Sequence, residues 1–262
     1  ILTKKYFAWL LFTFHVFAAP YADEWFLVGS NSQFFLILST YLAFVLKVGP
    51  SLMKDRAPFK LTNILLAYNI AQVAVSAYIC KLVTHIKWIT TLPLGLSRER
   101  SLGQRNSTSI ELLRDSSLSE LLDTIFFVLR KKDRQVSFLH VYHHSAVFFY
   151  SWAMMSYKEA FLSVTVIGFL NSVVHLIMYS YYALSVFPSI SKYLWWKKYI
   201  TKIQMIQFSM MIAYILFEYM TSPCKLPKSL ATHLLLNISL VFALFVNFYR
   251  HTYKSSHKSK KS

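Results

Sequence analysis

Three histidines stand close together in the segment His140-Val-Tyr-His143-His144, immediately before a run of apolar residues. Residues at positions i, i+3 and i+4 of an α-helix lie on one face, so a helix here would present three imidazoles together. Ionisable side chains are costly inside a membrane and usually mark a functional site. The spacing therefore predicts a catalytic or ligand-binding face, against the plainer alternative of hydrogen-bonded core histidines.

Polar side chains recur at helical spacing in three further apolar segments, and in each segment they fall on one face. Taken alone, the glutamines suit hydrogen bonds between membrane helices, and Asp123 suits an ion pair with Arg130 or Lys131. Together with the histidines, these sets favour one shared interior pocket, because polar groups within a bilayer need partners inside the protein. The three sets are Glu120 with Asp123, Asn171 with His175 and Tyr179, and Gln204 with Gln207.

The composition places these segments in a membrane. Of the 262 residues, 55% are hydrophobic and 15% are charged, whereas soluble domains carry about 25% charged residues. The 28 Lys and Arg residues lie in short clusters between apolar runs, so we expect no nucleic-acid partner despite the net positive charge. Cys80 and Cys224 form no CxxC pair, and we expect neither a disulfide nor a bound metal.

A membrane-crossing helix needs about 20 mostly apolar residues, and seven segments meet or approach this length. The first is closed by Lys47 and by Gly49-Pro50. The expected fold class is therefore all-α, a polytopic membrane protein with about seven transmembrane helices and no internal linker. The expected spans are residues 27–46, 61–83, 118–129, 136–156, 159–186, 200–220 and 230–249.

The distribution of basic residues orients the chain. The joints after the first, third and fifth spans, together with the tail, carry most of the Lys and Arg residues, which predicts a cytosolic carboxyl terminus. Asp123, His143 and Gln204 then lie toward the cytosolic side, and His175 lies deeper. A polar centre above an apolar core suits an amphiphile whose head arrives from the cytosol, such as a fatty acyl-CoA.

Two chemistries fit the histidines. Membrane di-iron desaturases and hydroxylases also use HxxHH boxes, but they need several boxes, and only four of the nine histidines lie near the expected pocket. The other chemistry is acid–base or nucleophilic catalysis, in which an imidazole takes a proton or an acyl group and a carboxylate orients it. The five histidines that lie elsewhere are His15, His85, His233, His251 and His257.

Short segments along nearly the whole chain occur in an order that resembles the ELO family of very-long-chain fatty acid elongases, the membrane 3-oxoacyl-CoA synthases. They are Trp25-Phe-Leu, Gly49-Pro50 with Met53-Lys-Asp-Arg56-Ala-Pro58, Tyr68-Asn69, Glu120-Leu-Leu-Asp-Thr-Ile-Phe-Phe-Val-Leu-Arg-Lys-Lys132, His140-Val-Tyr-His-His144, Asn171-Ser-Val-Val-His-Leu-Ile-Met-Tyr-Ser-Tyr-Tyr182 and Thr201-Lys-Ile-Gln-Met-Ile-Gln-Phe208.

The resemblance implies seven helices in the endoplasmic reticulum membrane, with the last six around a narrow acyl-chain tunnel. It also implies the reaction, in which a long-chain acyl-CoA and malonyl-CoA condense to 3-oxoacyl-CoA with release of CoA and carbon dioxide. No metal or redox cofactor belongs to this step. The implied partners are the bilayer and the reductase and dehydratase enzymes of the elongation cycle. The resemblance leaves open whether the protein forms a homo-oligomer.

The resemblance further implies residue roles. His143 would attack the thioester to give an acyl-imidazole, and His175 would be its partner in acid–base work or positioning. His140 and His144 would orient His143 or assist proton transfer, with Glu120 and Asp123 behind them. The residues expected to line the site are Asn171, Tyr179, Gln204 and Gln207. The basic residues expected to attract the CoA phosphates are Lys54, Arg56, Arg130, Lys131, Lys132 and Arg134.

The expected organisation has three parts: an amino-terminal extension over residues 1–22 that mimics a signal peptide, an ELO-type transmembrane domain over residues 23–253, and a basic cytosolic tail over residues 254–262. The tail ends in Lys258-Ser-Lys-Lys-Ser262, which resembles a KxKxx retrieval signal. Residues 90–117 form a polar stretch unlike the family, with Ser117 where the family has Lys. Either its residues extend the third helix, or the stretch is a gene-model artefact.

Two alternative functions are kept beside the elongase interpretation. One is a histidine-box di-iron desaturase or hydroxylase. The other is a seven-helix protein that binds a lipid without chemistry, although such a protein has no need for a triple-histidine face beside two carboxylates.

Overall fold

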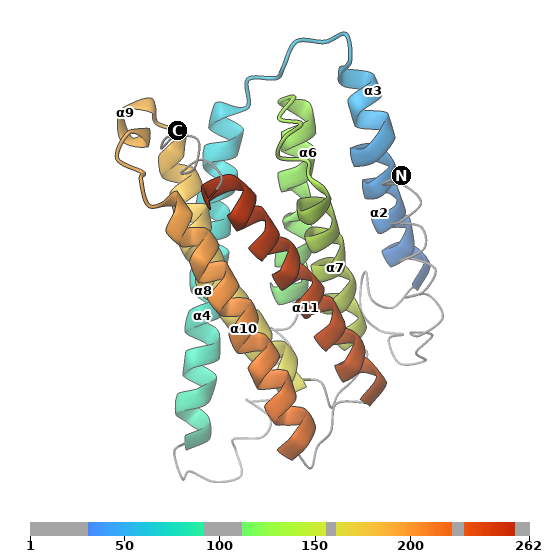
Figure 1. Cartoon of the computed structure of the whole chain (residues 1–262), viewed down its shortest axis with the longest axis vertical. Coiled ribbons are helices and arrows are strands. Elements are labelled where there is room, and N and C mark those ends of the chain that lie inside the picture. The colour runs from blue at the N-terminus through green and yellow to red at the C-terminus, as the bar shows by residue number, and fades with distance from the viewer. Residues whose placement is uncertain (1–30, 92–111, 156–160, 222–227, 255–262) are drawn as a thin grey trace. The chain divides into compact units, whose positions relative to one another are not determined.

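The computed structural model describes residues 31–91, 112–155, 161–221 and 228–254, which are helical apart from short joints (Figure 1). The chain divides into two compact units, each built from two separate stretches. Unit 1 comprises Ile1–Leu61 and Arg114–Phe161, and unit 2 comprises Thr62–Leu113 and Leu162–Ser262. The predictions for residues 1–22, for the tail beyond Lys254 and for residues 92–111 lie outside the described residues.

The first described helix of unit 1 continues past its predicted end. It consists of α2 (Asn31–Ala43), the π-helical turn η1 (Phe44–Val48) and α3 (Gly49–Met53), which form one continuous run in Figure 1. The prediction that Lys47 and Gly49-Pro50 close this helix is wrong. Pro50 lacks an N–H and its ring crowds the preceding turn. The wider π turn directly before it, in which the Gly49 N–H bonds to the Phe44 carbonyl, accommodates that ring.

Gly49 allows a close approach between α3 and α6 (Leu121–Leu129). A Cβ atom at this position would lie 2.7 Å from Val128 Cγ1 and 2.9 Å from the Phe44 carbonyl oxygen. Both distances are shorter than real Cβ contacts, and neither neighbour is the end of a flexible side chain. Only glycine therefore fits at this contact.

The third span is longer than its apolar residues suggest. Residues 112–119 are helical, a turn follows at Glu120, and α6 begins at Leu121. The Glu120 N–H bonds to the Ser116 carbonyl at 3.0 Å, and the Asp123 N–H bonds to the Glu120 carbonyl at 3.2 Å. Residues 112–117 of the polar stretch are thus helical, and whether the stretch is a gene-model artefact stays an open prediction.

The end of α6 is a Schellman motif with lysine in the left-handed position. Lys131 has φ of 52°, its N–H bonds to the Val128 carbonyl at 3.0 Å, and the Lys132 N–H bonds to the Phe127 carbonyl at 2.9 Å. The Lys131 ammonium donates to the Lys54 carbonyl at 3.0 Å. The joint after α3 and the joint after α6 therefore lie at the same end of unit 1, as the expected topology requires.

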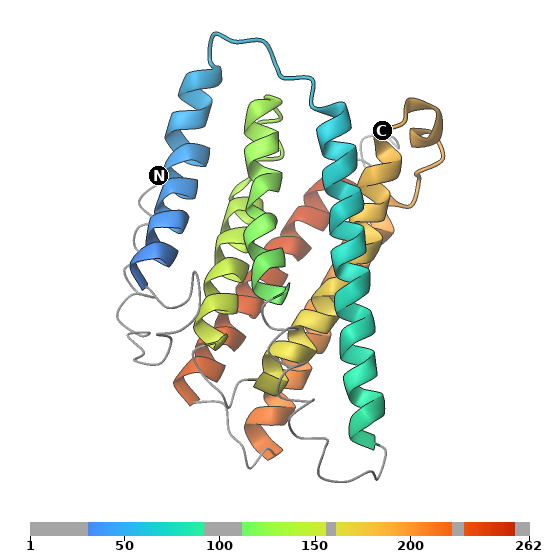
Figure 2. The same cartoon turned by 180° about the vertical axis from the view of Figure 1, so that it is seen from behind.

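Unit 2 contains α4 (Thr62–Thr91), α8 (Phe161–Ser185), the short α9 (Pro188–Ser191), α10 (Lys197–Thr221), α11 (Lys228–Tyr249) and the π-helical turn η3 (Arg250–Lys254). Figure 2 shows α4 beside α8 from the back. Aromatic and apolar side chains of α8 pack with residues of α4, of the α8–α10 connection and of α10. The buried members of this core are Met178, Tyr179, Tyr181, Leu194 and Ile200, with Tyr68 and Val73 packed against them.

The all-α membrane class is confirmed. Five helices in the described part of the chain are long and apolar enough to cross a bilayer: Ser32–Met53, Thr62–His85, Ser163–Ser185, Lys197–Thr221 and Lys228–Tyr253. The other two expected spans fall short for identifiable reasons. Three histidines lower the hydropathy of α7 (Phe138–Met155), and α6 is separated from residues 112–119 by the turn at Glu120.

We expect Gly49→Ala to lower the stability of the protein in detergent, measured as the midpoint of thermal unfolding. Overpacking costs about 1–3 kcal/mol, which exceeds the gain of about 1 kcal/mol from replacing glycine within a helix. The matched control is Gly168→Ala in α8, where the three atoms nearest to the added Cβ all belong to the side chain of Leu113, whose flexible end can move aside. Equal unfolding midpoints for the two variants would contradict the close contact of α3 with α6.

Candidate active site

The first turn of α7 is capped by a side chain. The Ser137 hydroxyl accepts a hydrogen bond from the His140 N–H at 3.3 Å. A serine in this position satisfies a backbone donor that the helix itself leaves unpaired. The cap therefore fixes where α7 begins and places its three histidines in the first two helical turns.

The three histidines of α7 lie together, as their spacing predicts. The ring centroids of His140 and His144 are 4.3 Å apart, and those of His143 and His144 are 5.2 Å apart with the rings nearly perpendicular. Phe127 of α6 packs against His140 at 5.0 Å. His144 is buried, whereas His140 and His143 are half-buried.

Glu120 lies beside His144. Its side chain is 1% exposed, and its Oε2 is 3.9 Å from His144 Nδ1. The Ser116 hydroxyl donates to the other carboxylate oxygen at 3.2 Å. This distance exceeds hydrogen-bond length. A carboxylate beside an imidazole can orient the ring for acid–base or nucleophilic chemistry.

Asp123, the second predicted carboxylate, is buried on α6 next to Thr124. The Tyr41 hydroxyl of α2 donates to Thr124 Oγ1 at 2.9 Å, which ties the first helix of unit 1 to α6 at this level. Unit 1 thus contains five of the six predicted catalytic residues, two carboxylates and three imidazoles. Their catalytic roles stay predictions.

The sixth, His175, lies in unit 2 within a polar chain between α8 and α10. Asn171 Nδ2 lies 3.5 Å from His175 Nδ1, and Gln207 Nε2 donates to Asn171 Oδ1 at 3.1 Å. One turn along α10, Gln204 Nε2 donates to the sulfur of Met178 at 3.6 Å. The polar faces predicted on spans five and six therefore meet each other directly.

Tyr179 packs against His175 on α8. Its ring is fully buried and meets the His175 imidazole edge-on, with centroids 5.4 Å apart. Tyr68 of α4 meets Tyr179 in the same manner at 6.0 Å. This packing makes Tyr179 part of the core of unit 2, and its predicted contact with substrate stays a prediction.

The basic residues after α6 differ in exposure. Lys131 is half-buried and uses one donor on the Lys54 carbonyl, whereas Lys132 and Arg134 are exposed. Because Lys54 and Arg56 belong to the neighbouring joint, positive charge gathers at one end of unit 1. Such a cluster attracts phosphate groups.

Sequence reasoning missed a buried carboxylate in α10. Glu218 is 7% exposed and accepts a hydrogen bond from the Ser163 hydroxyl of α8 at 2.6 Å. The signal was present, because an acidic residue within an apolar span is itself unusual. Sequence reasoning also missed Ser116 and Ser137, since serines in polar joints are too common to stand out.

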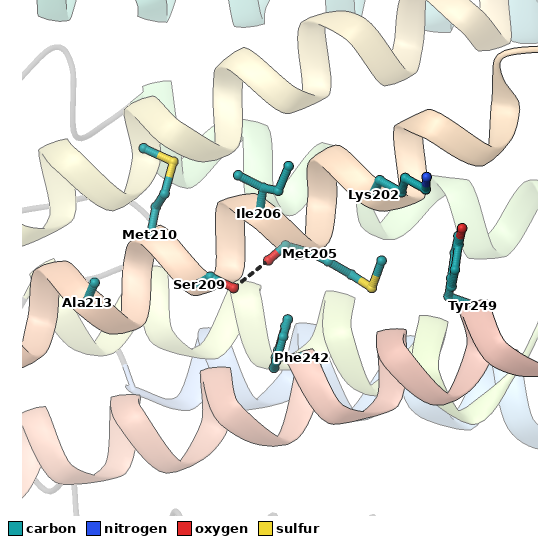
Figure 3. Close-up of a pocket in the computed structure, with 8 residues that line it drawn as sticks. All are labelled: Lys202, Met205, Ile206, Ser209, Met210, Ala213, Phe242 and Tyr249. Atoms are coloured by element: carbon teal, nitrogen blue, oxygen red, sulfur yellow. Dashed lines mark hydrogen bonds between the residues drawn. The ribbon is translucent and has the colours of Figure 1, made fainter.

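An open groove lies between α10 and α11 (Figure 3). Its volume is about 640 Å³, within the range of ligand pockets, and its walls are almost wholly apolar. None of the predicted site residues is among those that line it. Its lining residues are Lys202, Met205, Ile206, Ser209, Met210, Ala213, Phe242 and Tyr249.

Comparison with known proteins identifies the family. The sequence profile of the ELO family, described as GNS1/SUR4, matches residues 26–261. This chain belongs to the ELO family. Among its relatives are three proteins named very long chain fatty acid elongases.

These relatives match the ELO chain over most of its length. Elongase 2 of Mus musculus is 39% identical over 236 residues, which cover 88% of this chain and 79% of the relative. Elongase 1 of Homo sapiens is 37% identical, with coverage of 90% and 86%, and elongase 7 of Rattus norvegicus is 32% identical, with coverage of 94% and 89%. The family resemblance predicted from the ordered segments is therefore confirmed.

In this ELO protein, we expect Ser137→Ala to loosen the first turn of α7, because the variant lacks the acceptor for the His140 N–H. Loss of such a cap costs about 1 kcal/mol, and amide hydrogen exchange of residues 138–141 should be several-fold faster. Ser137→Asp is the matched control, since its carboxylate can still accept the bond. Equal exchange in the two variants would contradict the capping role.

Proposed function

We propose that this ELO protein condenses a long-chain fatty acyl-CoA with malonyl-CoA, which is the first step of a fatty acid elongation cycle. One observation carries the proposal: a chain whose relatives are named elongases holds three clustered imidazoles beside a buried carboxylate at 3.9 Å. Imidazole nitrogen is a competent acyl acceptor. One imidazole of the cluster can thus act as the nucleophile, and a neighbouring imidazole of the same helix can take up the proton that the nucleophile gives up.

In the first half-reaction, a nitrogen of His143 attacks the thioester carbon. The carbon–sulfur bond breaks, CoA leaves as the thiolate and takes up a proton, and the acyl group stays on the imidazole. His143 is the member of the cluster that meets His144 edge-on, while His144 is the member beside Glu120. His144, which lies beside Glu120, would orient His143 or assist its proton transfer, as the family resemblance implies.

In the second half-reaction, malonyl-CoA loses carbon dioxide and the electron pair of the broken bond forms an enolate. The enolate carbon attacks the acyl carbon, the carbon–nitrogen bond breaks, and His143 is restored as 3-oxoacyl-CoA leaves. His175, held by Asn171, would serve as the partner group for this chemistry. Neither half-reaction requires a metal or a redox cofactor.

The charged and apolar parts of the substrate suit different parts of the chain. Positive charge at the joints of unit 1 would attract the CoA phosphates, with the exposed Lys132 and Arg134 the most accessible groups. The acyl chain would occupy the narrow tunnel expected among the last six helices. The protein would reside in the endoplasmic reticulum membrane with its tail in the cytosol, where reductase and dehydratase enzymes would process the product.

The proposal is tested with the full chain in lipid nanodiscs, supplied with a long-chain acyl-CoA and radiolabelled malonyl-CoA. We expect labelled 3-oxoacyl-CoA, and we expect His143→Ala to lower its rate of formation by about 10³-fold or more, because the nucleophile is lost. Ser209→Ala is the control, since this exposed serine donates its hydroxyl to the Met205 carbonyl of its own helix.

Three outcomes would overturn the proposal. Acyl-CoA binding without labelled product would favour a lipid-binding protein. A product that forms only with oxygen would favour the di-iron alternative. Equal rates for His143→Ala and the wild type would remove His143 as the nucleophile.

A further inference from the structure

A chain of polar contacts in unit 2 runs from a methionine of α10 to the imidazole of His175 on α8. Gln207 Nε2 lies 4.0 Å from the Met211 sulfur and donates to Asn171 Oδ1 at 3.1 Å. Asn171 Nδ2 lies 3.5 Å from His175 Nδ1. Gln207, Met211 and His175 are buried, with exposed fractions of 4%, 4% and 6%. Which atom donates in each of these hydrogen bonds therefore determines which ring nitrogen of His175 carries the proton.

Side-chain amides alone would leave that direction undetermined. If both amides were reversed, Asn171 would donate to Gln207, and the Asn171 oxygen would face His175 Nδ1. That arrangement would require the His175 proton on Nδ1 instead of Nε2. Two amides in contact can satisfy each other in either direction, so a third group must decide between the arrangements.

Met211 decides the direction. A thioether sulfur only accepts hydrogen bonds, so it favours the amino group of Gln207 and disfavours its oxygen. With its amino group toward Met211, Gln207 also donates to Asn171 Oδ1, which leaves the Asn171 amino group facing His175. The Gln204 contact with Met178 repeats the pattern of an amide amino group on a methionine sulfur one turn away.

We infer that Gln207 is a positioning residue that, through Asn171, holds His175 in the tautomer with its proton on Nε2. Because Nδ1 faces an amino group, it must accept and cannot carry the proton of a neutral imidazole. His175 then carries an N–H donor on Nε2, the kind of group that stabilises a developing carbonyl oxyanion. This inference rests on the proposed function and, of the two roles predicted for His175, favours positioning, by hydrogen-bond donation, over acid–base work.

The test is ¹⁵N NMR of histidine-labelled full chain in nanodiscs at pH 8, above the ordinary imidazole pKa of about 6.5. The His175 signals are assigned by their loss in His175→Gln. We expect an unprotonated Nδ1 and a protonated Nε2 in the wild type. Asn171→Asp should reverse the tautomer, because a carboxylate accepts from both Gln207 and Nδ1–H.

Gln207→Leu tests the positioning residue itself. Without its donor, Asn171 can turn, and we expect a mixture of both His175 tautomers and a kcat lowered by about tenfold or more, with a smaller change in KM. Ser209→Ala, on the exposed side of the same helix, should leave the tautomer unchanged.

A protonated Nδ1 in the wild type would overturn the inference, and that measurement needs no variant to fold. A wild-type spectrum in Gln207→Leu would overturn the role of Gln207. Because the tautomer is read without turnover, these results stand apart from the elongase assay. An inactive chain with the expected tautomer would refute the proposed function alone.

Discussion

Polar groups inside a membrane-spanning helix have no water to bind, so each must find a partner within the protein. This constraint organises both units. In unit 1, Tyr41 bonds to Thr124 and Ser116 bonds to Glu120. In unit 2, the bonds between α8 and α10 follow from the same requirement. The polar side chains that suggest chemistry in the sequence are therefore also the side chains that fix neighbouring helices to each other.

One polar face can therefore both hold two helices together and orient an imidazole. Asn171 bonds to Gln207 across two helices and to His175 along its own helix, so a single residue joins helix packing to the orientation of an imidazole. Between α6 and α7, aromatic packing performs a related task, since the ring of Phe127 packs against His140 with centroids 5.0 Å apart. A loss of packing at these contacts would misplace reactive nitrogens as well as destabilise the helices.

Helical spacing predicted much of this arrangement. The one-faced histidines of α7 and the polar faces of α8 and α10 follow from the period of the helix and need no further information. The end of the first helix could not be predicted, because a π turn before Pro50 absorbs a residue that normally stops a helix. Lysine in the left-handed position after α6 is equally invisible, since the usual signal there is glycine.

Other features could not be predicted from the sequence because the residues that interact are far apart along the chain. Ser163 and Glu218 meet across two helices, and nothing near either residue indicates the other. The sequence left residues 112–117 open between two interpretations, because their polar composition argues against a membrane span, although backbone bonds continue to Glu120. Sequence patterns thus predicted which faces are polar, and the tertiary structure determined which partners satisfy them.

The central claim, that an imidazole of α7 carries the acyl group, is tested most directly by trapping the intermediate. The protein is incubated with acyl-CoA in the absence of malonyl-CoA, quenched, and mapped by peptide mass spectrometry. The account predicts one added acyl mass on His143, released when malonyl-CoA is supplied before quenching. An adduct on another residue, or full turnover by a protein that never carries an acyl group, would contradict it.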